Sequence, residues 1–262
     1  VFEPAIDLAA NGFPVSHKLA QAMAGDLSLR EFPSSAAIFA PQGRTPMAGE
    51  LLLQRDLART FERLASDGRD YFYRGPIARA IVSCSERYGG LLALEDFARY
   101  EARWQEPISA GYRGWTVYEA PPNSSGHVLL QELNIVEQFD VKSLGCNSAA
   151  AIHLMVEAKK LAFADRERYL ADPDWVDVPI TGLLSKEYAR ERGRAINLDR
   201  AADTVTAGDP WKYQGGSPRP ASPRRSSGQQ EDTTCFAVVD GEGNAVCQLQ
   251  SLQSGFGSGL VA

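Results

Sequence analysis

The chain has 262 residues, of which 44% are hydrophobic and 23% charged. This composition is typical of a globular protein with enough apolar side chains for a substantial core. Its net charge of −6 argues against nucleic-acid binding, because proteins of that class usually carry basic surfaces. No run of residues approaches the ~18 apolar residues of a membrane span, so we expect no span in this sequence.

The first part of the chain shows helical periodicity. Apolar residues recur at helical spacing over 51–66 (LLLQRDLARTFERLAS), and the stretch 75–87 continues in the same manner. A short strand is expected at 115–118. The chain then breaks at PPNSSG, where Ser125 is placed to cap a helix over 127–139.

The longest expected helix runs over 148–171. Its apolar residues form one stripe at helical spacing. These are Ala151, Leu154, Met155, Ala158, Leu161 and Ala162. Asp165 extends the stripe, with Arg166 and Arg168 beside it. Charged groups near protein cores are usually paired, so we interpret Asp165 as a buried, arginine-paired structural carboxylate rather than a general acid.

Residues 204–232 differ in composition from the rest of the chain. They are rich in Gly, Ser, Pro and Arg, with almost no large apolar side chain after Trp211. Such a composition cannot build a packed core. We predict a mobile linker there, in which Arg224 and Arg225 are solvated charges rather than a binding site.

A β-hairpin is expected directly after this linker. Two β-compatible runs, 233–239 and 245–252, flank the turn-forming sequence DGEGN at 240–244. Glycine, Asp and Asn between two such runs are typical of a tight hairpin connection. The loop length then decides which residues face each other.

Two registers are possible for this hairpin. A three-residue loop with Gly243 in the left-handed conformation pairs Asp240 with Asn244 and places Ser251 opposite Thr233. A two-residue loop shifts the pairing by one residue and moves Ser251 to the other face. Only the first register gives Thr233 a neighbouring hydroxyl.

Thr233 is a candidate nucleophile that cleavage of the chain uncovers. A neutral hydroxyl is a poor nucleophile until a base takes its proton, and the local sequence offers none. If the bond between Asp232 and Thr233 is cut, the new α-amino group, with a pKa near 8, supplies that base on the same residue. Taken alone, the Thr-Thr pair is far more typical of ordinary β-branched strand residues than of a nucleophile.

The surrounding sequence carries a family resemblance. The segment TTCFAVVDGEGNAV at 233–246, continued by FGSG at 256–259, resembles the start of the small subunit of γ-glutamyltranspeptidases, also called glutathione hydrolases. Upstream blocks resemble successive parts of that family's large subunit, in the same order. They are 4–16 (PAIDLAANGFPVS), 72–81 (FYRGPIARAI), 118–126 (YEAPPNSSG) and 155–178 (MVEAKKLAFADRERYLADPDWVDV). Several ordered blocks are far more specific than one motif.

The resemblance implies an α+β fold, the four-layer αββα sandwich of the N-terminal-nucleophile hydrolases, of which this sequence is a partial, helix-rich fragment. It also implies a precursor that cuts itself between Asp232 and Thr233. On this interpretation, 1–203 is the C-terminal part of a large subunit. Residues 204–232 are the linker before the cleavage site, and 233–262 begin the small subunit, which stays associated with the large one.

The same resemblance implies roles for three residues. Thr233 attacks a γ-glutamyl amide, and the resulting ester is resolved by water, an amino acid or a dipeptide. Ser251 stands where many members have Thr, and its hydroxyl assists the nucleophile. Gln253 falls at a position that is often Asn or Glu and that contacts the N-terminal amine or the substrate. This departure resembles the divergent γ-glutamyltransferase-like branch of the family.

Two other functions stay open at this point. A change in the acyl pocket at Gln253 favours an acylase that acts on glutaryl or cephalosporin-type amides. An intact Asp232–Thr233 bond favours a catalytically silent homologue. The family's arginine for the substrate carboxylate is expected before Val1 and its oxyanion hole beyond Ala262, so we expect the fragment alone to be inactive.

Neither a metal nor a cofactor is expected. The three histidines are far apart in sequence, and the four cysteines lack metal-ligand spacing. In the three-residue-loop register Cys235 and Cys247 are diagonal neighbours, which we expect to be too far apart for a disulfide. Free thiols favour a cytoplasmic location over a periplasmic or secreted one.

Overall fold

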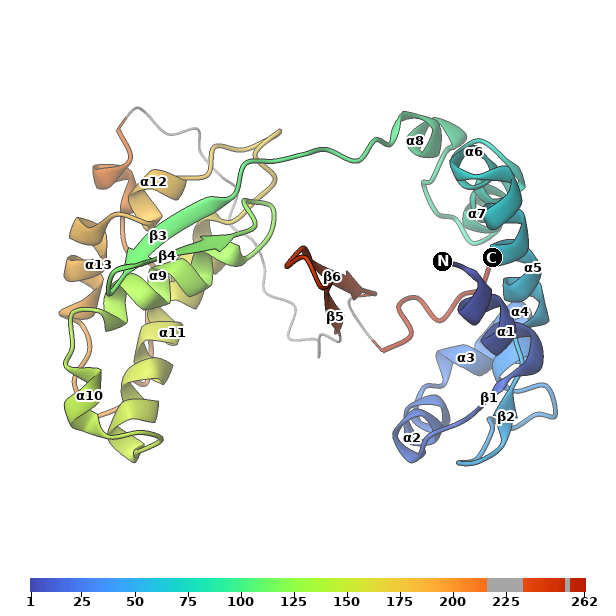
Figure 1. Cartoon of the computed structure of the whole chain (residues 1–262), viewed down its shortest axis with the longest axis horizontal. Helices are drawn as coiled ribbons and strands as arrows, with labels where there is room; N and C mark the ends of the chain where they lie inside the picture. Colours follow the sequence, from blue (N-terminus) through green and yellow to red (C-terminus); the bar gives the residue numbers. More distant parts are fainter. Residues whose placement is uncertain (216–232, 253–254) are drawn as a thin grey trace. The chain divides into compact units, whose positions relative to one another are not determined.

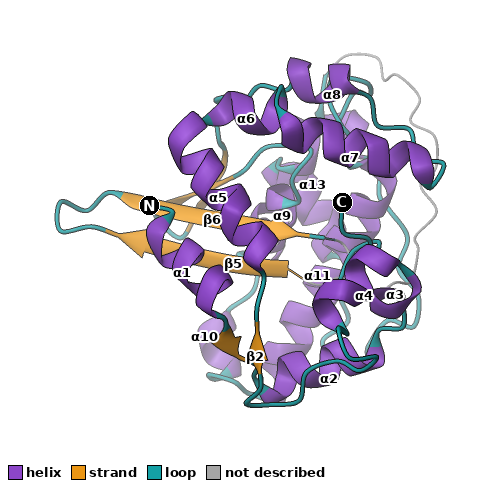
Figure 2. Cartoon of the chain, turned by 90° about the vertical axis from the view of Figure 1, so that its right-hand side faces the viewer, coloured by secondary structure: helices purple, strands orange, loops and turns teal. Residues whose placement is uncertain are grey.

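The protein, seen here as a computed structural model, is described over residues 1–215, 233–252 and 255–262 (Figure 1). Its contacts divide the chain into two compact units. Unit 1 comprises Val1–Ala102 and Gly228–Ala262, and unit 2 comprises Arg103–Ser227. Helices dominate both units, and the strands of the described residues form three two-stranded antiparallel sheets (Figure 2). No helix in these described ranges has the length and apolarity needed to cross a bilayer.

Unit 1 consists of short helices joined by tight connections. Its helices are α1 (Glu3–Asn11), α2 (His17–Gly25), α3 (Ser28–Glu31), α4 (Pro33–Phe39), α5 (Arg55–Asp67), α6 (Arg69–Tyr73), α7 (Pro76–Arg87) and α8 (Leu94–Arg99). Its strands are β1 (Phe13–Pro14), β2 (Leu51–Leu52), β5 (Thr233–Val239) and β6 (Ala245–Ser251). Proline begins α4 and α7, where its missing N–H costs nothing. The Ser16 hydroxyl caps α2 by accepting from the Leu19 N–H at 3.1 Å.

The core of unit 1 joins residues from both ends of the chain. Val15, Met23, Leu29 and Leu52 are buried together, and Phe39 and Phe256 pack against them. The two phenylalanine rings are 5.9 Å apart between centroids. The segment after the β5–β6 hairpin is therefore held on the N-terminal helices by apolar contact.

Unit 2 packs three helices around one apolar cluster. Its elements are β3 (Ile108–Tyr112), β4 (Trp115–Glu119), α9 (Gly126–Val136), α10 (Val141–Leu144), α11 (Ala149–Tyr169), α12 (Ile180–Leu183), α13 (Lys186–Gly193) and the 3₁₀ helix η1 (Pro210–Tyr213). The cluster consists of Ile135, Val136, Leu154, Ala158, Leu161 and Ala189. The Ser148 hydroxyl caps α11 through the Ala151 N–H at 3.1 Å.

A carboxylate with four partners lies beside this apolar cluster. Asp165 is 0% exposed, and it accepts hydrogen bonds from the Gln131 amide, the Tyr188 hydroxyl at 2.8 Å and the Gly208 N–H at 2.8 Å. Arg192 Nε lies 3.3 Å from its Oδ2. Burial raises the pKa of Asp165, while these donors and the Arg192 charge act in the opposite direction. The prediction of a buried, arginine-paired carboxylate is confirmed.

The arginine that pairs with Asp165 is distant in sequence. Arg166, its neighbour, instead donates to the Ser125 hydroxyl at 3.0 Å and pairs with Glu167. Ser125 therefore does not cap α9 with its side chain, contrary to the sequence prediction. A helix directs successive side chains about 100° apart, so a residue next to Asp165 cannot follow it into the core.

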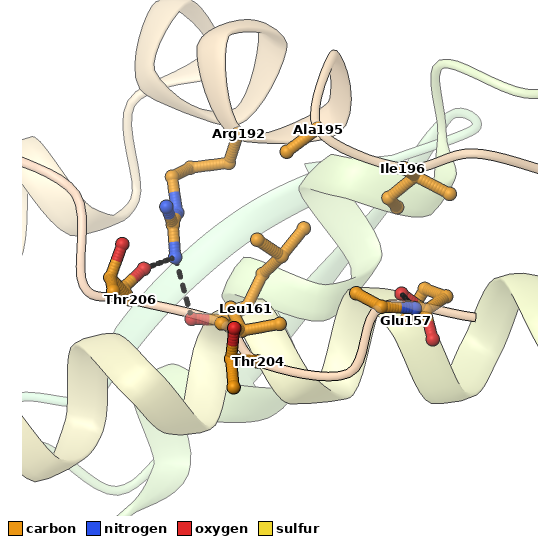
Figure 3. A pocket seen from close by; sticks show the side chains of 9 residues that line it. Glu157, Leu161, Arg192, Ala195, Ile196, Thr204 and Thr206 are labelled. Carbon is orange, nitrogen blue, oxygen red and sulfur yellow. Dashed lines mark hydrogen bonds between the residues drawn. The ribbon is translucent and has the colours of Figure 1, made fainter. Parts of the chain in front are cut away.

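Residues 204–215, which composition assigns to a linker, are held on unit 2. Arg192 Nη2 donates to the Leu161 carbonyl at 3.2 Å and to the Thr206 carbonyl at 2.8 Å (Figure 3). Tyr169 Oη donates to the Gly208 carbonyl at 2.6 Å. These bonds use the backbone of the segment, so its polar side-chain composition gives no sign of them. The rest of the predicted linker, 216–232, lies outside the described residues.

The other predicted elements are largely confirmed, with two corrections. The helices at 75–87 and 148–171 and the strand at 115–118 are present as α7, α11 and β4. The helix predicted from residue 51 begins at Arg55, because Leu51 and Leu52 pair with β1 instead. Met155, placed in the buried stripe of α11, is 52% exposed, because it lies at the edge of that stripe.

The imidazole of His127, at the start of α9, is buried without hydrogen bonds from the described part of the chain to its ring nitrogens. It is 0% exposed, and neither ring nitrogen has a hydrogen-bond partner among the described residues. Burial and the nearby Arg166 charge lower its pKa to about 4, since both disfavour the imidazolium. Protonation of His127 is thus much easier in the unfolded chain than in the folded one.

We predict that this histidine makes stability depend on pH. Because the folded pKa lies below the unfolded value of about 6.5, its contribution is complete above pH 6.5 and is lost as the pH falls toward 4. Between pH 7 and pH 5 the free energy of unfolding should fall by about 2 kcal/mol. Urea denaturation at the two pH values measures this, and His127→Leu should flatten the dependence. The control is His17→Leu, at an exposed position, which should keep the wild-type slope. Equal slopes in wild type and His127→Leu contradict the prediction.

Candidate active site

The candidate site is built on the β5–β6 hairpin. The two strands pair without interruption from Val239 opposite Ala245 to Thr233 opposite Ser251. Asp240 N donates to the Asn244 carbonyl at 3.0 Å and closes the ladder. The three-residue loop predicted as one of two possibilities is therefore confirmed, and the two-residue loop is excluded.

The turn that sets this register is fixed by one carboxylate. Asp240 Oδ1 accepts from the backbone N–H groups of Glu242 and Asn244, both at 2.9 Å, and Oδ2 accepts from the Asn244 side-chain amide at 2.7 Å. These bonds lower the pKa of Asp240, and the bond from the Asn244 side-chain amide contributes most. Gly243 has φ 85°, a left-handed conformation that favours glycine.

The register decides what lies beside the predicted nucleophile. Antiparallel ladders alternate between hydrogen-bonded and non-hydrogen-bonded pairs. Counting from the bonded pair Asp240–Asn244, Thr233 and Ser251 form a non-hydrogen-bonded pair. In such pairs the α-carbons are only about 4.5 Å apart. The structure thus brings together these two predicted site residues, whereas Asp232 and Gln253 lie outside the described residues.

A second set of contacts fixes the chain directly after the hairpin. Ser35 Oγ, which is buried, donates to the Gly259 carbonyl at 2.6 Å and accepts from the Val261 N–H at 3.0 Å. Ser34 Oγ donates to the Val261 carbonyl at 2.6 Å. Sequence reasoning missed this clamp, because two serines in a helix carry no signal of a distant partner. Gly259 lies directly against Ser28 of α3.

Other polar clusters offer less chemistry. Unit 2 has a cavity of about 170 Å³ near Arg192 (Figure 3). The one carboxylate among its described lining residues, that of Glu157, already accepts hydrogen bonds from Lys160 Nζ at 2.7 Å and from the Ala202 N–H at 3.2 Å. No group of three or more His, Cys, Asp or Glu side chains suited to a metal ion occurs within the described ranges. The hairpin is therefore the best candidate for a reactive centre.

Comparison with known proteins identifies the family to which this chain belongs. The sequence profile of the family described as Gamma-glutamyltranspeptidase matches residues 1–262. The "Glutathione hydrolase proenzyme" of Escherichia coli (strain K12) is 40% identical over 265 residues, which cover 100% of this chain and 43% of that protein. The "Acylase ACY 1 proenzyme" of Pseudomonas sp. (strain SE83) is 38% identical over 262 residues, covering 98% of this chain and 44% of that protein.

Solved structures agree with these relatives. A cephalosporin acylase from Bacillus halodurans has a TM-score of 0.79 at 35% identity, covering 98% of this chain and 45% of that one. Helicobacter pylori γ-glutamyltranspeptidase has a TM-score of 0.69 at 35% identity, covering 78% of this chain and 58% of that one. The fold is that of the N-terminal-nucleophile hydrolases, as predicted. The chain belongs to the γ-glutamyltranspeptidase family, and it spans less than half the length of these curated relatives.

We predict that the close approach of Gly259 to Ser28 stabilises the attachment of residues 255–262 to the N-terminal helices. Gly259 has φ 70°, and a Cβ there would lie 2.0 Å from Ser28 Oγ and 2.4 Å from Ser28 Cβ. Gly259→Ala should therefore lower the free energy of unfolding by about 1–3 kcal/mol, measured by urea denaturation. Gly255→Ala is the matched control, because a Cβ there meets nothing within 4 Å. Equal stability of the two variants contradicts the proposed contact.

Proposed function

We propose that the complete protein hydrolyses or transfers γ-glutamyl groups through an ester on Thr233. The observation that carries this proposal is the register that sets Thr233 opposite Ser251. Family membership and relatives named as glutathione hydrolase proenzymes support it. The substrate is then glutathione or a related γ-glutamyl compound, and the acceptor is water, an amino acid or a dipeptide.

The first step of this proposal is maturation. The Thr233 hydroxyl attacks the carbonyl carbon of Asp232, and the peptide C–N bond breaks as the nitrogen takes up a proton. The resulting ester between Asp232 and the Thr233 oxygen is hydrolysed by water. This leaves the Asp232 carboxylate at the end of a large subunit and a new α-amino group on Thr233, with the two subunits still associated.

Turnover repeats the same chemistry on a substrate. The α-amino group, with a pKa near 8, takes the proton of the Thr233 hydroxyl as it attacks the γ-glutamyl carbonyl. The amine of the substrate leaves with a proton, and the γ-glutamyl ester is resolved by the acceptor. Ser251 orients the nucleophile from the opposite strand, and Gln253 contacts the amine or the substrate.

A second candidate function is cleavage of a glutaryl or cephalosporin-type amide. It is favoured by the likeness to proteins named as acylases, at 38% and 35% identity. The substrates differ in the α-amino group, which glutaryl compounds lack. Measuring kcat/KM for both γ-glutamyl-p-nitroanilide and glutaryl-p-nitroanilide distinguishes the two functions. Higher values for the glutaryl compound replace the first proposal with the second.

We predict that Thr233→Ala blocks both maturation and turnover, because it removes the attacking oxygen of each step. The measurement is the intact mass of the purified full-length protein, together with the γ-glutamyl-p-nitroanilide assay. Wild type should give two subunits, the smaller beginning at Thr233, and the variant one uncut chain. Thr234→Ala is the matched control and should still be cut at the same bond. A variant that is cut correctly, or a wild type that stays intact, refutes the proposed nucleophile.

We predict that Ser251→Ala slows maturation or turnover by roughly 10- to 1000-fold, the range expected for a misoriented nucleophile. Folding should be nearly unchanged, since one hydrogen bond at an exposed position contributes about 1 kcal/mol. Ser251→Thr should keep most of the activity, because it retains the hydroxyl and suits a strand. Gln250→Ala, one residue earlier and on the other face, serves as the control. Unchanged rates in Ser251→Ala exclude a role for this hydroxyl.

A further inference from the structure

Two cysteines lie on the same hairpin as the predicted nucleophile. Cys235 and Cys247 are both exposed thiols, and their sulfurs are 3.7 Å apart. In the register Cys235 is opposite Leu249 and Cys247 is opposite Ala237, so the pair is diagonal, as predicted. No disulfide joins them in this structure, but the two sulfurs are in van der Waals contact, closer than expected for a diagonal pair.

The contact has a physical origin in the ladder. Counting from the bonded pair Asp240–Asn244, both Ala237–Cys247 and Cys235–Leu249 are non-hydrogen-bonded pairs, whose side chains approach most closely. The right-handed twist of a two-stranded ribbon is large and shortens one diagonal between such pairs. A disulfide has an S–S length of about 2.05 Å. The two sulfurs need only approach by somewhat under 2 Å, which small χ1 rotations and a change in strand twist supply.

We propose that Cys235 and Cys247 form a reversible disulfide across the hairpin, with a low-molecular-weight disulfide as the oxidant. One cysteine, as its thiolate, attacks the small disulfide, forms a mixed disulfide and releases one small thiol. The second cysteine, again as its thiolate, then attacks the protein sulfur of that mixed disulfide and releases the other small thiol. The two protein thiols are oxidised to one disulfide, and the small disulfide is reduced to two thiols that carry the protons.

The position of the pair connects this modification to the candidate site. Side chains alternate faces along a strand, so Cys235 lies on the same face as Thr233, two positions away. Cys247 shares the face of Ser251 for the same reason. A bond between the sulfurs fixes the strand twist beside the Thr233–Ser251 pair. This consequence rests on the proposed function: oxidation should lower kcat at least about fivefold with little change in KM, because orientation of the nucleophile changes rather than substrate binding.

The test uses the full-length protein, treated under native conditions with bis(2-hydroxyethyl) disulfide, an oxidant that has no γ-glutamyl group. The other two cysteines of residues 1–262 are replaced in a Cys84→Ser/Cys146→Ser background, so that any disulfide within these residues is this one. Cleavage after Glu242 by a glutamate-specific protease falls between Cys235 and Cys247 in the sequence. The two resulting peptides should stay joined after oxidation and separate on reduction. Either single replacement, Cys235→Ser or Cys247→Ser, should give only a mixed disulfide with 2-mercaptoethanol.

Activity is measured on the same samples. In the Cys84→Ser/Cys146→Ser protein, kcat should fall on oxidation and recover with dithiothreitol. The same protein with both Cys235→Ser and Cys247→Ser, which has no hairpin thiol to oxidise, should show no such reversible loss. Peptides that separate without reduction, or two cysteines that each carry 2-mercaptoethanol, overturn the disulfide. A disulfide that forms without change in kcat overturns its effect on the site. Absence of γ-glutamyl turnover in the reduced wild type refutes the proposed function instead, and the peptide analysis still decides the disulfide.

Discussion

The register of the β5–β6 hairpin is the constraint on which the candidate site depends. A slip of one residue would move every side chain of one strand to the opposite face, and would separate Ser251 from the face of Thr233. Asp240 prevents such a slip by accepting three hydrogen bonds inside the turn, and Gly243 adopts the left-handed conformation that the loop requires. The distance along the chain between this turn and Thr233 is therefore unimportant, because an uninterrupted ladder carries the register from one end of the hairpin to the other.

The chain that follows the hairpin is held by contacts with the N-terminal helices. Beyond β6 the chain returns to the N-terminal helices, where Phe256 joins an apolar cluster and Ser35 binds the backbone of Gly259 and Val261. These contacts join residues from opposite ends of the chain. If the chain is cut before Thr233 as proposed, contacts of this kind hold the two parts together, because only non-covalent contacts then join them. In this chain the contacts combine apolar burial with hydrogen bonds between the buried Ser35 hydroxyl and the backbone, which are costly to break.

Unit 2 is organised around a different kind of constraint, a buried carboxylate. Asp165 is stabilised by Tyr188, Gln131, Arg192 and the Gly208 N–H, and removal of any one partner leaves a buried charge less compensated. The group joins α9, α11 and α13 to the segment that precedes the predicted cleavage site. We interpret it as structural. Its four partners occupy the hydrogen-bonding positions of the carboxylate oxygens. The described residues around it provide no second acid or base in the arrangement that catalysis requires.

The sequence by itself determined the family, the hairpin and most of the long helices. Each of these depends on local pattern: the periodicity over 148–171, the turn residues at 240–244, and ordered blocks that resemble one family. It also limited the hairpin to two registers and predicted a paired carboxylate at Asp165. Only the tertiary structure decided which register holds, that Arg192 is the partner of Asp165, that residues 204–215 are held on unit 2, and that the two hairpin sulfurs touch. The reason is common to all four. Each depends on atoms distant in sequence, on backbone groups that every residue shares, or on the twist of a strand pair, and none of these leaves a pattern in the order of the side chains.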